Sequence, residues 1–250
     1  MVLTVAHVSD LHIGGRPESV ARAAQVIGHV CSMSPAPDVL LVTGDIADHG
    51  SPEEYATARD LLSAWDGPLL VGTGNHDVRG PFARVLMGGD REGPLDQELD
   101  VGAYRFLMLD SLVPAVGGQR IDHGELADAT LAWLDERLAA SPRPTFVCFH
   151  HPPTTVGIGQ ADAIQLRNGP ALEAVLTRHP HVVAVLVGHN HTMCVTTFAG
   201  RPALVGGGVV SSVTLDQEPQ DHIWMDAPPT LAVHLIGDDG RLTSFWRALV

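Results

Sequence analysis

The sequence predicts a mixed α/β fold, because short apolar runs alternate with longer stretches of helical periodicity. Hydrophobic residues make up 45% of the chain and charged residues 18%, a balance that favours a buried sheet over a disordered or fibrous chain. The length of 250 residues lies near the upper end of the single-domain range. We therefore expect one domain over residues 1–250 with a large hydrophobic core.

The first third of the chain predicts the order strand, helix, strand, helix, strand. The expected strands cover Leu3–Val8, Val39–Thr43 and Leu69–Val71, and the expected helices cover Pro17–Cys31 and Pro52–Trp65. The second helix has the best-defined start, since Ser51 can cap it and Glu54 can complete a capping box three residues later.

The rest of the chain predicts a second sheet region and a mostly β C-terminal part. Residues 95–109 suit a hairpin broken at Gly102, and a helix over 126–138 and a strand over 145–149 follow. A helix over 170–178 precedes a strand over 182–187, and short strands are expected near Val195, Ala203, Leu231 and Leu242. Two segments without periodicity, Thr154–Asn168 and Asp216–Pro229, are expected to be long loops.

The charge balance and the cysteines limit the classes of function. Fifteen basic and 29 acidic residues give a net charge of −14, which argues against binding a nucleic acid duplex. A small anionic substrate therefore needs a local positive centre. Cys31, Cys148 and Cys194 lack disulfide or zinc-ribbon spacing, which is typical of a reducing cytoplasm. Without a basic leader or an apolar run of membrane-span length, neither export nor membrane anchoring is expected.

Five polar clusters each follow an apolar run that predicts a strand. They are Asp10 with His12, Gly44 with Asp45, Gly74-Asn75-His76-Asp77, His150 with His151, and Gly188 with His189 and His191. Residues beyond the carboxyl ends of strands in an open α/β sheet converge on one edge, so clusters far apart in the sequence can form one site. Carboxylate, amide and imidazole groups together suit Mn, Fe, Co or Zn better than Ca or Mg. The pattern therefore predicts a metal site.

These clusters resemble the motifs of the calcineurin-like metallophosphoesterases. The family pattern DxH, GD, GNH[DE], H and GHxH is matched by Asp10-Leu11-His12, Gly44-Asp45, Gly74-Asn75-His76-Asp77, His150 and Gly188-His189-Asn190-His191. The resemblance implies a four-layer αββα sandwich of two mixed β-sheets flanked by helices. It also implies two divalent metal ions with Asp45 as the bridging ligand. The ligand sets are Asp10, His12, Asp45 and His191 for one metal, and Asp45, Asn75, His150 and His189 for the other.

The same resemblance assigns His76 to the substrate side, where it can donate a hydrogen bond to the phosphate or protonate the leaving oxygen. Asp77 could orient the ring of His76, and Asn75 and His151 are further candidate substrate contacts. The family's metal ligand is His150, although on the sequence alone either neighbouring imidazole could reach a metal.

Charge arithmetic supports this chemistry. Two carboxylates facing two divalent ions leave a charge of about +2, which can hold one hydroxide and one diester anion. We therefore expect water activated between the metals to attack phosphorus in line, without a covalent enzyme intermediate.

Asp48 and His49 narrow the substrate class. Protein Ser/Thr phosphatases of this fold carry arginine where this chain has His49, and purple acid phosphatases carry a tyrosine ligand where Asp48 stands. The motifs GDIADHG, GNHD, HHPP and GHNH resemble those of the bacterial class III cyclic nucleotide phosphodiesterases, and glycerophosphodiesterases share them. The first expected substrate is a cAMP-like 3′,5′-cyclic nucleotide, and a glycerophosphodiester is the alternative.

Two other functions remain open. A monoester phosphatase needs an extra cation for the second phosphate charge, and the motifs offer no clear arginine for it, although Arg16 and Arg79 are nearby in the sequence. A catalytically silent scaffold of this fold would bind a partner through its sheet face, which the complete ligand set argues against. A homodimer is compatible with each of these functions. Histidines outside the clusters, including His7 and His234, lack ligand spacing and are expected in the core or at the surface.

Overall fold

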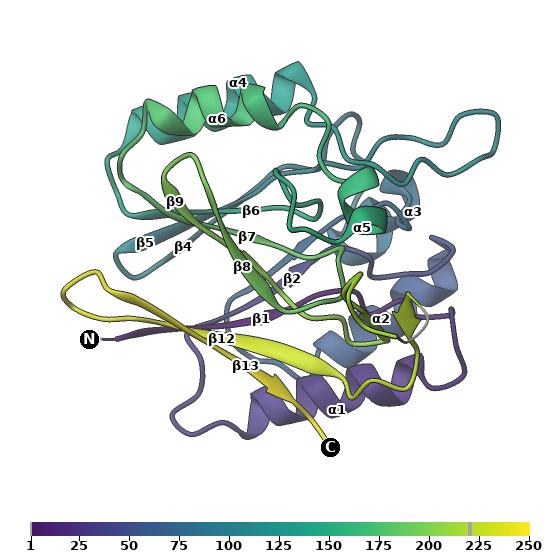
Figure 1. Cartoon of the computed structure of the whole chain (residues 1–250). Coiled ribbons are helices and arrows are strands. Elements are labelled where there is room, and N and C mark those ends of the chain that lie inside the picture. Colours follow the sequence, from purple (N-terminus) through teal and green to yellow (C-terminus); the bar gives the residue numbers. More distant parts are fainter. Residues whose placement is uncertain (1, 220–221) are drawn as a thin grey trace.

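Two β-sheets lie face to face at the centre of the molecule, and helices cover their outer faces (Figure 1). The computed structural model describes residues 2–219 and 222–250. Strands of both sheets end at one common edge of the molecule, and the predicted metal ligands lie in the loops that follow these strand ends.

The first sheet is mixed and has the strand order β13-β12-β1-β2-β3. Its strands are β1 (Leu3–Val8), β2 (Val39–Thr43), β3 (Leu69–Gly72), β12 (Thr230–Ile236) and β13 (Leu242–Ala248). The strands β1, β2 and β3 run parallel, whereas β12 pairs antiparallel with β1 and with β13. The expected βαβαβ order is therefore confirmed, and the C-terminal hairpin returns to the N-terminal strand.

The second sheet is also mixed and has the order β4-β5-β6-β7-β9-β8. Its strands are β4 (Gln97–Val101), β5 (Tyr104–Met108), β6 (Thr145–Cys148), β7 (Val182–Val187), β8 (Cys194–Phe198) and β9 (Arg201–Val205). The inner strands run parallel, and β4 and β8 are antiparallel at the two edges. A separate short pair, β10 (Ser212–Val213) with β11 (Ile223–Trp224), lies outside both sheets.

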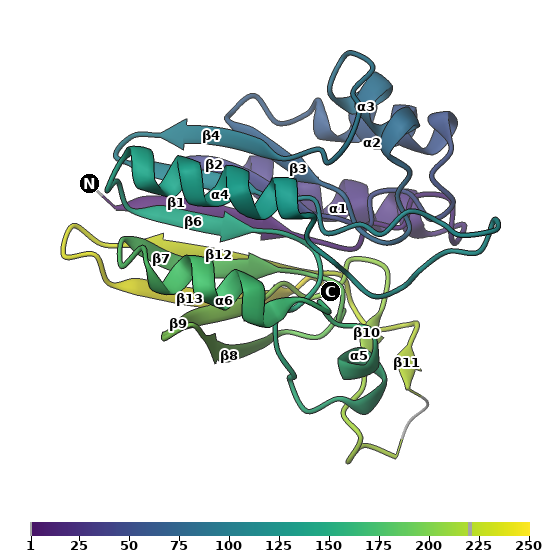
Figure 2. The same cartoon turned by 90° about the horizontal axis from the view of Figure 1, so that it is seen from above.

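Helices cover the outer faces of both sheets, and Figure 2 shows one of these layers from above. The helices are α1 (Ser19–Ser32), α2 (Pro52–Leu62), α3 (Arg79–Leu86), α4 (Asp128–Ala140), α5 (Gly159–Ala163) and α6 (Gly169–Thr177). The short helix α5 lies apart from both layers, beside β10 and β11. Apolar residues of α1, α2 and α3 pack on the outer face of the first sheet. Those of α4 and α6 pack on the second sheet. The expected four-layer αββα sandwich is therefore confirmed.

A third apolar layer lies between the two sheets and holds them in register. Phe106 and Phe146 are fully buried in it and stack with ring centres 5.1 Å apart. Burying each such side chain contributes about 2–3 kcal/mol. On β1, Leu3 and Val5 face this layer while Ala6 contributes to the helix-covered side. Because both sheets share this layer, their strand ends are fixed at the same edge.

Several predicted boundaries are confirmed. The capping box at α2 is present, with the Glu54 amide donating to Ser51 Oγ at 3.2 Å and the Ser51 amide donating to Glu54 Oε2 at 3.0 Å. Such a cap contributes about 1 kcal/mol. The hairpin turns at Gly102, where φ is +57°.

The short elements were not expected from the sequence. Helix α5 lies inside the predicted loop Thr154–Asn168, and β11 lies inside the predicted loop Asp216–Pro229, of which residues 220 and 221 are outside the described part. Helix α3 spans only eight residues and begins with Arg79-Gly80-Pro81, so it carries little periodicity. Over the described residues, every helix is too short or too polar to cross a membrane.

Candidate active site

The seven predicted metal ligands lie directly beyond the ends of five strands. Asp10 and His12 follow β1, Asp45 follows β2, Asn75 follows β3, His150 follows β6, and His189 and His191 follow β7. Backbone hydrogen bonds join these loops: the Asp10 amide donates to the Gly44 carbonyl at 3.1 Å, and the Gly188 amide to the His150 carbonyl at 2.9 Å. The two sheets therefore bring all seven side chains to one place.

The backbone is strained at most of these positions. Six non-glycine residues in the described part of the chain have positive φ, and five of them are predicted ligands: Asp10, His12, Asp45, His189 and His191. Such a conformation costs of order 1 kcal/mol or more for a residue with a side chain, and it persists where the surroundings impose it. The surrounding structure therefore holds these loops in a conformation that brings the predicted ligands together.

The glycines of the motifs are required by close packing around the ligands. A Cβ at Gly44, where φ is +95°, would lie 2.6 Å from His150 Nδ1 and 2.8 Å from the Thr73 carbonyl oxygen. A Cβ at Gly74 would collide with the carboxylate and amide of Asp45. Both glycines therefore let neighbouring loops approach closely enough for their side chains to meet.

The first predicted ligand set converges as expected. Asp10, His12, Asp45 and His191 each offer a ligand atom, and these atoms all lie within 4.8 Å of one another. His191 Nε2 is 3.3 Å from Asp10 Oδ1, and His12 Nε2 is 3.4 Å from Asp45 Oδ2. These are the separations of donors that face a common centre.

The second predicted set converges around His150 Nε2. This atom lies 3.3 Å from Asp45 Oδ2, 3.2 Å from Asn75 Oδ1 and 3.2 Å from His189 Nδ1. Asp45 Oδ2 therefore approaches a histidine from each set, as a bridging carboxylate must.

The donor chemistry of the site fits a pair of cations. His12 Nε2 and His191 Nε2 face each other at 3.1 Å, and both nitrogens also face carboxylate oxygens. Asp10 Oδ1 is buried and has no hydrogen-bond donor in the described structure. A buried carboxylate oxygen without a donor is costly, and a metal ion satisfies it. The observed geometry therefore agrees with the predicted binuclear centre.

Several ligands are oriented by a second contact on the ring atom that faces away from the centre. Asp48 Oδ1 lies 2.9 Å from His12 Nδ1, Ser211 Oγ lies 2.7 Å from His191 Nδ1, and the Thr43 carbonyl oxygen lies 2.7 Å from His150 Nδ1. Each contact leaves Nε2 directed at the centre. The sequence marked Asp48 only as a departure from other branches of the family, and its contact with His12 was not anticipated.

The buried charges perturb one another. Burial lowers the pKa of His150, but the carboxylates of Asp45 and Asp10 outweigh this effect and raise that pKa to about 9. Burial raises the pKa of Asp10, but His191 and His150 outweigh it and lower that pKa to about 2. Burial also raises the pKa of Asp45, but His150 and His12 outweigh it and hold that pKa well below its usual value. Both carboxylates are thereby held in the ionised form that binds metal.

His76 lies on the cavity side of the centre, as expected. Its Nδ1 is 3.0 Å from the Asp48 carbonyl oxygen and 2.8 Å from Arg120 Nη1. The first neighbour accepts a hydrogen bond and the second donates one, so Nδ1 can serve one of them at a time. In either case Nε2 is the nitrogen left to face a substrate.

Asp77 does not orient the ring of His76, which corrects that expectation. Its carboxylate accepts hydrogen bonds from the backbone amides of Gly74, Ile46 and Ala47 at 2.8, 3.2 and 3.1 Å. The hydroxyl of Tyr55 donates to the same carboxylate at 3.1 Å. Asp77 therefore ties together the loops that carry Asp45 and Asn75, and Asp48 is the residue beside the imidazole of His76.

His151 is fully buried, and this corrects its expected contact with substrate. Its Nδ1 lies 2.8 Å from Ser111 Oγ, and its ring packs against His189 with ring centres 4.6 Å apart. It belongs to a close group with His150 and His189. Only His150 of the neighbouring pair lies within ion-pair distance of Asp45 among the described residues, which favours His150 as the ligand.

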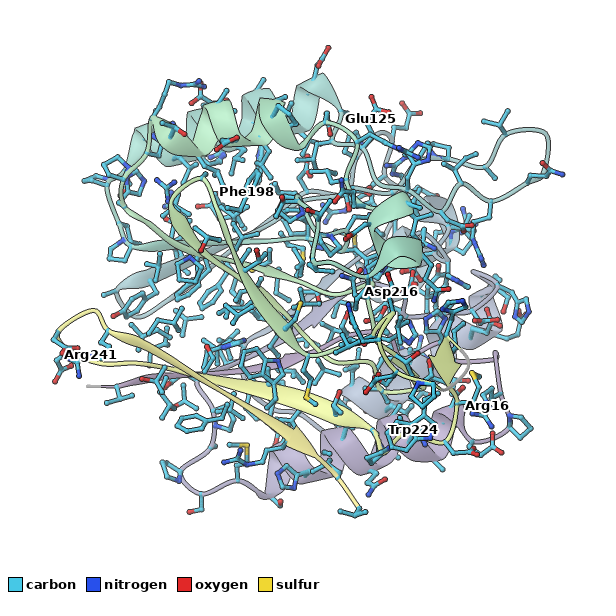
Figure 3. All side chains as sticks on the ribbon, viewed as in Figure 1. Arg16, Glu125, Phe198, Asp216, Trp224 and Arg241 are labelled. Carbon is cyan, nitrogen blue, oxygen red and sulfur yellow. The ribbon has the colours of Figure 1, made fainter. Side chains whose placement is uncertain are left out.

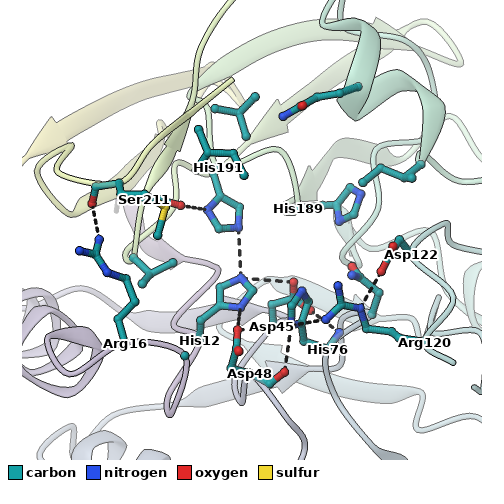
Figure 4. A pocket seen from close by; sticks show the side chains of 18 residues that line it. His12, Arg16, Asp45, Asp48, His76, Arg120, Asp122, His189, His191 and Ser211 are labelled. Carbon is teal, nitrogen blue, oxygen red and sulfur yellow. Dashed lines mark hydrogen bonds and ion pairs between the residues drawn. The ribbon is translucent and has the colours of Figure 1, made fainter. Parts of the chain in front are cut away.

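A cavity of about 390 Å³ opens above the predicted ligands (Figure 4). Figure 4 shows His12, His189 and His191 between Arg16 on the left and Arg120 with Asp122 on the right. Its outer wall is apolar and comes from α5 and the β10–β11 region, as Ile164, Val213, Ile223 and Met225. Figure 3 shows Arg16, Asp216 and Trp224 at this same end of the molecule.

Two arginines reach the cavity, and one of them was not anticipated. Arg16 Nη1 donates to the Met225 carbonyl at 2.7 Å, so this arginine supports the β11 wall. Arg120 comes from the long segment between β5 and α4, and its Nε donates to Asp122 at 2.6 Å. No motif or periodicity marks Arg120 in the sequence. Arg79, in contrast, pairs with buried Asp110 and does not border this cavity.

Comparison with known proteins supplies independent findings. The family model of the calcineurin-like phosphoesterases matches residues 3–193. The glycerophosphodiester phosphodiesterase GpdQ of Enterobacter lignolyticus is 32% identical over 246 residues, which cover 93% of this chain and 86% of that protein. A probable cyclic nucleotide phosphodiesterase of Synechococcus is 34% identical over 215 residues, 81% of each chain.

The fold likeness extends to solved structures of low sequence identity. A dimetal phosphatase from Danio rerio superposes with a TM-score of 0.69 at 16% identity and covers 98% of both chains. A purple acid phosphatase from yellow lupin superposes with a TM-score of 0.65 at 16% identity, over 99% of this chain and 54% of that one.

Proposed function

Because the chain belongs to the calcineurin-like phosphoesterase family, we propose that it hydrolyses a small phosphodiester with the help of two divalent metal ions. The observation that carries this proposal is the convergence of two donor sets on a shared carboxylate, that of Asp45. Asp10, His12 and His191 would hold one ion, and Asn75, His150 and His189 the other. Ions held there would lower the pKa of a bound water and would neutralise charge on the phosphoryl oxygens.

The protein's own residues position the substrate and move a proton. His76 Nε2 can donate a hydrogen bond to a phosphoryl oxygen or give a proton to the leaving oxygen when Nδ1 accepts from Arg120. When Nδ1 donates to the Asp48 carbonyl, Nε2 carries a proton only in the protonated ring. Ile223 and Met225 are partly exposed and give the far side of the cavity an apolar wall against which an organic group can pack. These roles need no covalent bond between enzyme and substrate.

We propose a 3′,5′-cyclic nucleotide as the first substrate. A cavity of about 390 Å³ is within the range that holds a drug-sized ligand. Ile223 and Met225 can pack against a heterocyclic base, and Gln160 offers amide groups to its edge. The relative from Synechococcus is named as a probable cyclic nucleotide phosphodiesterase. The relative from Enterobacter, named for glycerophosphodiesters, supports the alternative substrate.

The test is hydrolysis of bis(p-nitrophenyl) phosphate against p-nitrophenyl phosphate by metal-stripped protein reconstituted with Mn²⁺. The diester is expected to be preferred, and activity should fall about 10²–10⁴-fold in His76→Ala. Asn75→Ala should need more metal for half-maximal activity. His29→Ala, at an exposed histidine of α1, is the matched control and should retain wild-type activity. No turnover with any divalent metal would point instead to the scaffold.

A monoester phosphatase is the second candidate, and Arg120 is the observation that favours it. Its guanidinium lines the cavity beside His76 and could contact the second charge of a dianionic monoester. The salt bridge between Arg120 and Asp122 offsets part of the positive charge of the guanidinium, and this favours the diester over the dianionic monoester. If the protein is a monoesterase, Arg120→Gln should lower kcat/KM for the monoester by more than tenfold and leave the diester less affected.

We further propose that the chain is one domain, that it acts in the cytoplasm and that it carries Mn, Fe, Zn or Co. The mixed carboxylate, amide and imidazole set supports these metals over Ca or Mg. Elemental analysis of the purified protein identifies the metals. Sedimentation velocity measures whether the protein forms the homodimer that the sequence leaves open.

A further inference from the structure

A second open cavity of about 500 Å³ lies beside the first. We name the cavity over the predicted metal ligands the inner lobe and this one the outer lobe. Asp48, Asn75, His76 and Arg120 line both, so the two lobes meet at the imidazole of His76. The outer lobe runs from there between the start of α3 and the segment after β5.

The outer lobe has one apolar wall, while the polar side chains of Asp48, Asn75 and His76 lie at its border with the inner lobe. Its wall is formed by Val78, Leu112, Val113, Pro114 and Ala115. A group that occupies this lobe would therefore remove apolar surface from water, which favours an organic substituent over an ion.

Away from the inner lobe, the charged residues around the outer lobe are paired, and Arg120, which forms a salt bridge with Asp122, lies at the border of the two lobes. Arg79 Nε donates to Asp110 at 2.6 Å, and Arg79 also donates to the Leu112 carbonyl at 2.5 Å. His49 Nδ1 lies 2.8 Å from Glu54 Oε1 at the rim. These pairings leave the lobe poorly suited to a second phosphate.

The segment that supplies most of the apolar wall continues into a defined turn. Val116 and Gln119 exchange two backbone hydrogen bonds, both of 3.0 Å. Between them Gly117 and Gly118 have φ of +59° and +80°, which is the pattern of a two-residue type I′ hairpin turn. The contact from Arg79 to the Leu112 carbonyl joins the base of this segment to α3. The lobe is therefore a defined feature of the site.

The connectivity of a phosphodiester gives the two lobes different uses. In a cyclic nucleotide both ester oxygens belong to one nucleoside, so the inner lobe can hold the whole organic part. An acyclic diester has two separate organic groups that leave phosphorus in different directions. Hydrolysis joins a water oxygen to phosphorus and breaks the bond to one alcohol, whose oxygen takes a proton. His76, at the border of the lobes, is placed to supply that proton to an alcohol in the outer lobe.

We propose that the outer lobe is the subsite for the departing organic group of acyclic phosphodiesters, and that this group is uncharged and largely apolar. The proposal rests on the proposed phosphodiesterase function. It extends that function beyond cyclic nucleotides to diesters with two sizeable arms.

The proposal is tested by placing a large side chain on the wall of the outer lobe, where it would occupy the space for the departing group. Ala115→Trp places an indole at a residue that lines the lobe, and Val116→Trp places one at the neighbouring residue, which is 69% exposed and does not line it. In the Mn²⁺-reconstituted protein, Ala115→Trp should lower kcat/KM for bis(p-nitrophenyl) phosphate at least tenfold. Hydrolysis of 3′,5′-cyclic AMP should change less than twofold. Val116→Trp should behave as wild type with both substrates.

Calorimetric binding of diphenyl phosphate tests the subsite independently of turnover. It should weaken at least tenfold in Ala115→Trp and stay unchanged in Val116→Trp. Equal binding and equal diester turnover in both variants would overturn the subsite while leaving the phosphodiesterase intact. Wild-type protein that turns over no diester would refute the proposed function, and the binding measurement would still decide whether the lobe accepts an aryl group.

Discussion

Replacing Asp77 by alanine tests how the active-site loops are held. The carboxylate of Asp77 accepts hydrogen bonds from three backbone amides, those of Gly74, Ile46 and Ala47, and from the hydroxyl of Tyr55. Its exposure is 4%, so water has little access to these donors when the carboxylate is removed. Asp77→Ala therefore leaves several buried donors without a partner.

The size of the effect follows from those donors. An unpaired buried donor costs about 1–3 kcal/mol, and three amides would cost about 3–9 kcal/mol if none found water. The removed side chain leaves room for a water molecule near the amides, so we expect a loss of about 3–5 kcal/mol in the free energy of unfolding. Asp77→Asn keeps one acceptor oxygen and should lose less.

Urea unfolding of the metal-free protein, followed by circular dichroism, measures this loss. Asp60→Ala is the matched control, because the Asp60 side chain is 72% exposed on α2. It should change the free energy of unfolding by less than about 0.5 kcal/mol. If Asp77→Ala proves as stable as that control, then other contacts hold the loops and Asp77 does not tie them together.

Three further predictions concern metal and pH. Asp48→Asn should weaken Mn²⁺ binding about 10–100-fold, because Asp48 orients His12; calorimetry measures it, and unchanged affinity would contradict it. Metal present at 100 times its Kd stabilises the folded protein by about 2.7 kcal/mol, so removing it with a chelator should lower Tm by about 5–10 °C. Calorimetric scans with and without metal measure this shift, and an unchanged Tm would contradict it. Burial lowers the pKa of His7 from 6.5 to about 4, a shift that Asp10 opposes. Its folded pKa lies below its unfolded one, so the stabilisation is present above pH 6.5 and is lost as pH falls toward 4. Wild type should lose about 2 kcal/mol more than His7→Asn between pH 8 and pH 5, and parallel profiles would refute this.

The predicted ligands could be found from the sequence because their signal is local. Each follows an apolar run that predicts a buried strand, and strands that share a sheet deliver their carboxyl ends to one edge. Asp45 illustrates this: five buried residues form β2, and the carboxylate follows two residues after the strand ends. The four-layer arrangement was implied by the family resemblance, since periodicity alone did not assign helices to particular sheet faces.

Arg120 was missed and Asp77 was assigned the wrong contact, because the positions of both side chains depend on tertiary contacts. Arg120 lies in a segment without periodicity, and its approach to His76 across 44 residues of sequence depends on the path of that segment. Asp77 is adjacent to His76 in the sequence, which suggested a contact between the side chains. In the folded loop the Asp77 side chain turns inward to backbone amides instead, because those amides would otherwise be buried without acceptors.

The strained backbone at the ligands explains why local propensity gives way at this edge of the sheets. Asp10, Asp45 and His189 adopt positive φ, which is uncommon for residues other than glycine, although Asp and His tolerate it better than most. The parallel strands and the apolar layer between the sheets, with Phe106 and Phe146 at its centre, supply the stability that holds these conformations. The strained loops bring imidazole nitrogens and carboxylate oxygens close together, and a bound cation would offset the electrostatic repulsion between these lone pairs. Stability is therefore concentrated in the strands, and the cost of preorganisation is confined to the residues that immediately follow them.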